Sequence, residues 1–162
     1  MKIKALYLFM IMALLAPLFM VQSAQAETET LDGDIETEEI ISYVVGVGYQ
    51  VTYKVNFKTI AGIVYAWDRL IVTSQWQYSG GVWKANVESA SRSFWEDSEG
   101  QWSHVNHNTS AAGYSSNPIT KWTRDYLDAP VLYGAHTGTY KLSCATKPSQ
   151  VGKFNCSYIK EN

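Results

Sequence analysis

The sequence predicts an all-β protein built as an antiparallel β-sandwich. Apolar and polar residues alternate over several short segments, and Tyr49–Phe57 shows this pattern best, with every odd-numbered residue apolar or aromatic. Glycine-, aspartate- and asparagine-containing turn signals separate these segments at short intervals. The chain shows neither a long amphipathic helical pattern nor an internal repeat. Many short strands favour a sandwich, and a small β-barrel is the alternative.

The chain begins with the pattern of a secretory signal peptide over residues 1–26. Lys2 and Lys4 precede an uncharged, mostly apolar run over residues 5–21, and Ala24-Gln25-Ala26 supplies the small residues of a cleavage site. We therefore expect cleavage after Ala26 and a secreted, extracellular protein. The brief basic start favours a bacterial source.

Charge then divides the remaining chain into two parts. Residues 27–40 contain seven acidic residues and no basic one, which predicts an acidic flexible leader. Residues 41–162 form the expected single β-domain and contain eleven basic and eight acidic residues. This small positive excess gives no reason to expect a nucleic-acid partner. An alternative role of the leader is to cover a basic surface.

The first strands are expected at residues 41–47 and 49–57. Residues 60–67 are apolar and short, and Gly62 within them suggests a strand with a bulge. Asp68-Arg69 either breaks that strand or lies between two strands.

Gly80-Gly81 predicts a β-hairpin whose arms are residues 70–78 and 82–93. One face of this hairpin would be mostly apolar, and a slip of one residue would mix its two faces, so the pattern predicts the register. The expected cross-strand partners are Tyr78 with Trp83, Trp76 with Ala85, Ser74 with Val87, and Val72 with Ser89.

The next segments are less regular. Phe94-Trp95 and Gln101-Trp102 flank residues 96–100, whose sequence is typical of a turn. Residues 102–110 would form a polar strand. Asn117-Pro118 can begin a helix, but residues 118–127 also alternate as a strand, so we expect at most one short helix near 118–127. Residues 131–134 are a short strand candidate.

The last hairpin is expected between residues 138–146 and 154–160. Cys144 and Cys156 lie on the same side of these two strands, and an even cysteine count in an exported chain favours a disulfide between them. That bond would also place Leu142 opposite Tyr158.

No catalytic constellation is recognisable, so we predict neither an enzyme nor a cofactor. His104 and His107 would lie on opposite faces of a strand and could not share a metal, and His136 stands apart. No Gly-x-Ser-x-Gly elbow is present. The carboxylates from which a glycosidase pair could be drawn are Asp68, Glu88, Glu96, Asp97, Glu99, Asp125 and Asp128.

Trp95 and Trp102 are the candidate ligand-contacting residues because they flank a charged turn rather than a core run. An exposed indole can stack on a sugar ring while neighbouring polar groups bond its hydroxyls. The alternative is a cross-strand tryptophan pair that clamps a hairpin.

Together these features predict a secreted, non-enzymatic β-sandwich that binds at the cell envelope or outside it, with a polysaccharide as the candidate ligand. One alternative is a secreted antimicrobial or toxin-like protein, because an acidic leader precedes a basic, aromatic domain suited to membrane surfaces. The other is a small secreted hydrolase with a dispersed site.

Overall fold

The computed structural model describes residues 33–97 and 100–161, and over these residues the chain is an all-β protein. The expected signal peptide and its cleavage site lie outside the described residues, as does the leader over residues 27–32. In the described part, no helix combines the length and the apolar character needed to cross a lipid bilayer.

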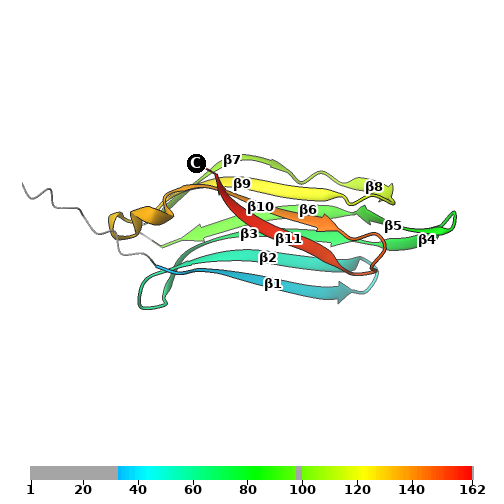
Figure 1. Ribbon diagram of the computed structural model, residues 1–162, viewed down its shortest axis with the longest axis horizontal. Helices are drawn as coiled ribbons and strands as arrows, with labels where there is room; N and C mark the ends of the chain where they lie inside the picture. The colour runs from blue at the N-terminus through cyan, green and yellow to red at the C-terminus, as the bar shows by residue number, and fades with distance from the viewer. Residues whose placement is uncertain (1–32, 98–99, 162) are drawn as a thin grey trace, which may run out of the picture.

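Two four-stranded antiparallel sheets form the body of the molecule (Figure 1). The first sheet has the order β1-β2-β3-β6, and the second has the order β11-β10-β9-β7. The first contains β1 (Ile35–Val44), β2 (Gly48–Lys58), β3 (Val64–Ser74) and β6 (Ser89–Glu96). The second contains β7 (Gln101–Asn108), β9 (Thr120–Asp128), β10 (Gly138–Thr146) and β11 (Phe154–Glu161).

A small third sheet continues the body at one end, to the right in Figure 1. It has the order β4-β5-β8 and contains β4 (Trp76–Ser79), β5 (Val82–Val87) and β8 (Ala112–Ser115). Its β4–β5 hairpin projects beyond the two larger sheets (Figure 1). Both large sheets have open edge strands in the described chain. The architecture is therefore the predicted sandwich and not the alternative, a closed β-barrel.

One core fills the space between the two large sheets. The predicted alternation of residues 49–57 is confirmed, because Val51, Val55 and Phe57 are fully buried. Across from them, Leu127, Tyr140 and Leu142 are also fully buried. Buried side chains alternate with exposed ones along the strands, so each sheet has one apolar face. These two apolar faces pack against each other.

The disulfide between Cys144 and Cys156 is present, and the predicted pairing of Leu142 with Tyr158 is confirmed. It joins the inner strand β10 to the edge strand β11. A disulfide is compatible with an extracellular protein.

The acidic segment is only in part a leader, because residues 35–40 form the first half of β1 and pair with β2. Glu36 forms an ion pair with Lys58, and Glu38 lies 4.0 Å from Lys54. Acidic residues at alternate positions of β1 thus lie next to lysines of β2. A count of charges within residues 27–40 does not show these ion pairs.

The Gly80-Gly81 hairpin has its predicted register only near the turn. Tyr78 pairs with Trp83 and Trp76 with Ala85, as expected. Farther from the turn the register shifts by one residue, so Val72 lies opposite Ala90 rather than Ser89. The shift lies at Glu88 and Ser89, which both oppose Thr73: the Glu88 N–H donates to the Thr73 oxygen, and Ser89 is the register partner of Thr73.

Of the two alternatives left open for residues 118–127, the structure adopts the strand: residues 120–128 form β9, because Lys121, Thr123, Asp125 and Leu127 all turn into the sandwich. Two other expectations differ from the structure. Val131–His136 is a 3₁₀ helix rather than a strand. Residues 60–62 form the turn between β2 and β3, and β3 continues through Asp68-Arg69 without a break.

Candidate functional site

Two tryptophans lie side by side on the outer face of the first sheet. Trp67 on β3 and Trp95 on β6 are directly opposite each other in the strand register. Because Asp68, Leu70 and Phe94 turn inward, the alternation of both strands points these two indoles outward. The Trp95 side chain is 44% exposed, and Trp67 is partly buried.

Two cationic side chains lie beside the Trp67 ring. Lys54 Nζ lies 5.5 Å from the centroid of the Trp67 ring, and Arg69 Cζ lies 5.0 Å from it. Arg69 also donates to Ser93 Oγ at 2.8 and 3.0 Å, which fixes its guanidinium next to the indole. These contacts hold Trp67 in one orientation through cation–π attraction.

A short row of polar groups continues across the same sheet face. Asn56 lies opposite Trp67 in the register and donates to Glu38 Oε1 at 2.9 Å. Asn56 itself is buried, so we call the surface formed by Lys54, Trp67, Arg69, Ser93 and Trp95 the tryptophan face. It combines apolar ring surface with hydrogen-bonding groups at fixed positions.

Trp102, the other tryptophan singled out in the sequence, is buried instead. It is 5% exposed, it packs edge-on against Phe57 at 5.6 Å, and its indole N–H donates to the Trp95 carbonyl oxygen at 3.1 Å. β6 and β7 belong to different sheets, so Trp95 and Trp102 do not clamp a hairpin. Residues 98–99 of the expected turn lie outside the described chain.

Sequence reasoning missed Trp67 as the partner of Trp95. Its signal was the alternation of residues 64–72, which is apparent only if the strand continues through Asp68-Arg69. A polar pair inside an apolar run suggests that the strand ends there. Here the strand continues, and Asp68 is buried next to Asp125 of the other sheet.

The second sheet also places an indole between two cations on its outer face. Arg124 Cζ lies 5.5 Å and Lys141 Nζ lies 5.2 Å from the Trp122 ring centroid. Arg124 is held in addition by Glu161, whose carboxylate lies 2.6 Å from its Nε atom. Trp122 has no second tryptophan opposite it, because its register partners are Ser143 and Asn108.

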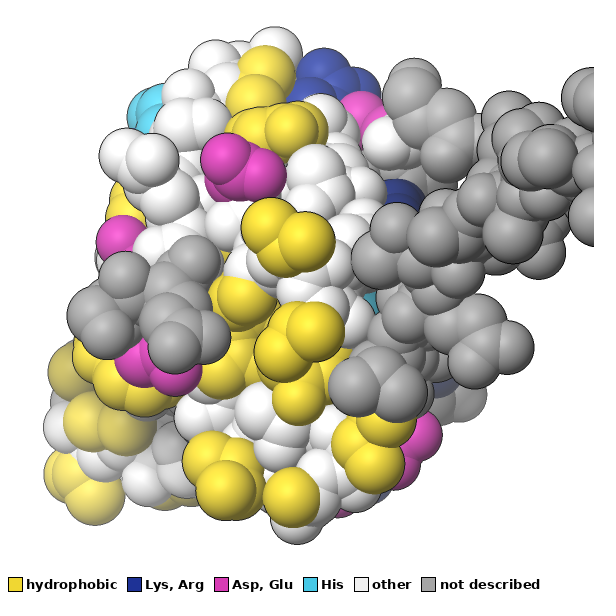
Figure 2. Space-filling view, turned by 90° about the vertical axis from the view of Figure 1, so that its left-hand side faces the viewer, with side chains coloured by type: hydrophobic (Ala, Val, Ile, Leu, Met, Phe, Trp, Pro, Cys, Tyr) yellow, Lys and Arg dark blue, Asp and Glu magenta, His cyan; other side chains and the backbone are white. Residues whose placement is uncertain are grey.

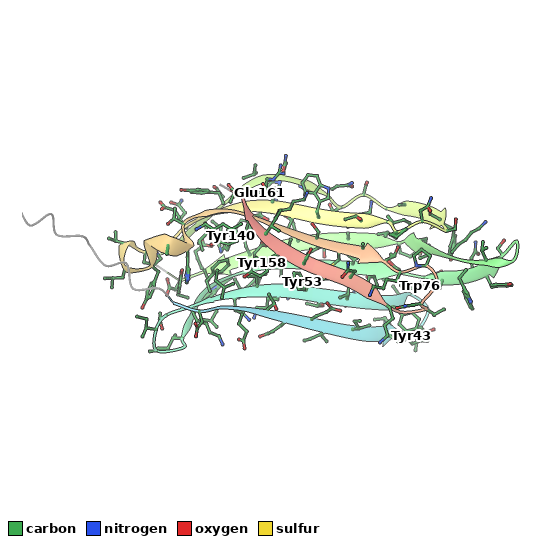
Figure 3. The ribbon with its side chains drawn as sticks, in the orientation of Figure 1. Tyr43, Tyr53, Trp76, Tyr140, Tyr158 and Glu161 are labelled. Atoms are coloured by element: carbon green, nitrogen blue, oxygen red, sulfur yellow. A yellow bond between two sulfur atoms is a disulfide. The ribbon has the colours of Figure 1, made fainter. Side chains whose placement is uncertain are left out.

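Aromatic side chains gather again at the end of the sandwich that carries the small sheet. Ring centroids lie 5.1 Å apart for Tyr43 and Tyr49, and 5.6 Å apart for Tyr49 and Trp76. Figure 3 shows Tyr43 and Trp76 together at this end. Two open hollows of about 470 Å³ lie here, one beside Tyr43 and Trp76 and the other beside Tyr78 and Trp83.

A buried acid pair lies between the two large sheets. Asp68 from β3 and Asp125 from β9 have no exposed surface, and Asp68 Oδ2 has no hydrogen-bond partner among the described residues. Burial raises the pKa of Asp68 well above its usual range, and the adjacent Asp125 carboxylate raises it further.

The acid pair connects to the surface through two histidines. His104 Nδ1 lies 2.7 Å from Asp125 Oδ1, and His104 Nε2 lies 2.9 Å from His107 Nδ1. The expectation that these histidines lie on opposite faces is therefore wrong. A bulge between His104 and Asn106 adds one residue to β7 and turns both rings to the same side.

These groups do not form an open catalytic site. Of the carboxylates that could have formed a glycosidase pair, Asp68 and Asp125 meet but neither reaches solvent, whereas Glu96, Asp97 and Asp128 line an open hollow beside Val131. Within residues 33–97 and 100–161, no cluster of three or more metal-ligating side chains is found. The remaining histidine, His136, is buried, with Nδ1 at 2.6 Å from the Tyr65 hydroxyl and Nε2 at 3.0 Å from the Gly33 oxygen.

Comparison with protein families, with curated proteins and with solved structures finds no match.

Proposed function

We propose that this protein is a secreted binding module that holds a glycan of the cell envelope on its tryptophan face. The observation that carries the proposal is the cross-strand pair of Trp67 and Trp95 on an outer sheet face, with Trp95 44% exposed. Sugar rings present apolar C–H faces that stack on indoles, and two adjacent indoles offer surface for more than one ring.

The polar groups of the face support the same ligand class. Arg69 and Lys54 carry several N–H donors beside the Trp67 ring, and Ser93 supplies a hydroxyl group. Glycan hydroxyls need donors and acceptors of this kind around an apolar platform. Because Arg69 is already fixed by Ser93, little side-chain freedom is lost on binding.

The secreted location rests on the signal peptide pattern over residues 1–26 and is supported by the disulfide. A flat face of this kind suits a long polymer that runs across the surface. Binding of such a polymer requires no enclosed cavity and no catalytic group.

The test is retention of the mature protein on insoluble cell-wall polysaccharides, compared with Trp95→Ala and Trp67→Ala. We expect each substitution to weaken retention by about tenfold, since each removes one stacking platform. Trp122→Ala is the matched control, because Trp122 is also an outward indole between two cations but has no tryptophan opposite it. It should leave retention unchanged.

Absence of retention on every polysaccharide tested would overturn the proposal. So would equal losses in the Trp95→Ala and Trp122→Ala variants, because the tryptophan face would then have no special role. Thermal unfolding of each variant separates lost binding from lost folding.

A further inference from the structure

Exposed apolar side chains are concentrated at the end of the sandwich formed by three turns. These are the β1–β2 turn around Val45, the β4–β5 turn around Val82 and the β10–β11 loop around Val151. The exposed fractions are 86% for Val45, 47% for Val82 and 40% for Val151. We call this surface the aromatic end, because Tyr43, Tyr78, Trp83 and Tyr114 are exposed between the turns.

Contacts between the turns hold this end together as one surface. Gln75 Nε2 donates to the Val47 oxygen at 3.1 Å, and the Tyr114 hydroxyl donates to Gln75 Oε1 at 3.1 Å. The Trp76 indole N–H donates to the Lys147 oxygen at 3.2 Å. The apolar side chains are therefore presented by a braced platform rather than by independent loops.

Charge at this end is mainly positive, with three lysines against the exposed Glu88, whose carboxylate accepts from the Asn86 side-chain amide. Residues 42–50, 74–87, 109–120 and 144–157 contain no aspartate or glutamate but include Lys84, Lys147 and Lys153. Lys84 lies on the β4–β5 hairpin, one residue from Trp83, and the other two lie in the β10–β11 loop. Lysines around an apolar tip attract an anionic surface and keep their ammonium groups in water as the tip enters it.

The opposite end has a different character. It also exposes apolar residues, with Ile63 65% and Val131 82% exposed. Acidic side chains lie among them, since Glu96, Asp97 and Asp128 line a hollow beside Val131. Figure 2, which faces this end, shows apolar patches interrupted by acidic groups. The molecule thus has one basic aromatic end and one acidic end.

We propose that the aromatic end docks onto an anionic lipid bilayer, with Val45, Val82 and Trp83 entering the headgroup region. Tyrosine and tryptophan prefer this interface because one part of each side chain is apolar and the other is polar. The projecting β4–β5 hairpin would enter first (Figure 1). Docking by this end leaves the tryptophan face, which lies along the side of the sandwich, open to a glycan.

The experiment measures partition of the mature protein into vesicles of phosphatidylcholine with 30% phosphatidylglycerol, as added probe lipid. We expect binding to these vesicles, weaker binding to pure phosphatidylcholine, and a further loss in high salt. Val82→Asp should weaken partition more than tenfold, and Lys84→Gln by about fivefold. The matched control is Val131→Asp, the same substitution at an exposed residue of the acidic end, which should bind as the unsubstituted chain does.

A second measurement distinguishes insertion from adhesion to any polyanion. Vesicles with brominated acyl chains should quench part of the tryptophan fluorescence, and Trp83→Phe should remove that quenching. Quenching that persists in Trp83→Phe would overturn the proposal, as would equal binding of Val82→Asp and Val131→Asp. Binding to soluble polyglycerol phosphate without any quenching by brominated lipid would overturn it in favour of an anionic polymer.

Discussion

His104 Nδ1 lies 2.7 Å from Asp125 Oδ1, so an imidazole at the surface is anchored on a carboxylate that has no exposed area. The same oxygen lies 3.3 Å from Arg92 Nη1, and Asp125 Oδ2 accepts the Thr123 hydroxyl at 2.5 Å. Asp68 packs against this group from the other sheet. The interior of the sandwich therefore contains a polar network that joins both sheets.

Asp68→Asn should make the protein more stable at neutral pH. The pKa of Asp68 is raised well above its ordinary value of 3.8 by burial and by Asp125. The folded state therefore keeps a proton that the unfolded state releases. The stabilisation from Asp68 is complete below pH 3.8 and is lost as the pH rises toward the raised folded pKa. Asparagine keeps a hydrogen-bond donor at this position and has no carboxyl proton to release, so it avoids the loss of stability at neutral pH.

The measurement for Asp68→Asn is the free energy of unfolding in urea at several pH values from 4 to 8. We expect the difference between variant and unsubstituted protein to grow in favour of the variant as the pH rises. A constant difference across this range would contradict a raised pKa for Asp68.

Asp125→Asn should have the opposite effect. Asp125 is the common acceptor for Arg92, His104 and Thr123, and an amide cannot accept from all three. Removing this acceptor leaves the buried Thr123 hydroxyl and the partly exposed Arg92 guanidinium without their partner, which should cost about 3 kcal/mol of stability at neutral pH. Glu161→Gln is the control, because its ion pair with Arg124 is partly exposed and should contribute less than about 1 kcal/mol. Similar losses in both variants would show that Asp125 is not the centre of the network.

Removing the disulfide in Cys144→Ser/Cys156→Ser should lower the free energy of unfolding by about 3 kcal/mol, the value for a loop with a separation of 12 residues. Denaturant unfolding with and without dithiothreitol measures this loss in the free energy of unfolding. The reductant should destabilise the unsubstituted chain to the same extent and leave the double variant unchanged. If the reductant shifts the variant as well, the loss cannot be assigned to this bond.

Asn86→Ala should destabilise the junction between β3 and the small sheet. Asn86 is 6% exposed, and its side chain accepts the Gln75 N–H that no backbone oxygen takes. Leaving that donor unpaired should cost about 2 kcal/mol in thermal or urea unfolding. Gln77→Ala, on the exposed face of the same hairpin, should change stability by less than about 0.5 kcal/mol. A neutral Asn86→Ala would show that the Gln75 N–H does not need this side chain as its acceptor.

The sequence predicted well wherever burial alternates along one strand. Residues 49–57 and the hairpin that carries Cys144 and Cys156 have the predicted faces and register. Near Gly80-Gly81 the pairing of Trp76 with Ala85 was also predicted, because a two-residue turn fixes its nearest partners. Beyond Glu88 the prediction failed, because Glu88 and Ser89 both oppose Thr73 and the extra residue shifts the register.

The candidate site was predicted only in part. Trp95 was singled out and is exposed, but Trp67 was missed and Trp102 is buried. The aromatic end was not foreseen, since Val45, Val82 and Val151 lie in turns that are far apart in the chain.

The alternation of residue types by itself determined that the chain is all-β, which faces of its regular strands are buried, and that Cys144 and Cys156 are joined. Only the tertiary structure decided that β6 and β7 belong to different sheets, that Asp68 meets Asp125, and that His104 and His107 share one side of β7. The physical reason is that side-chain direction within a strand follows from local backbone geometry. Sheet membership, bulges and buried polar pairs depend on partners that are distant in sequence.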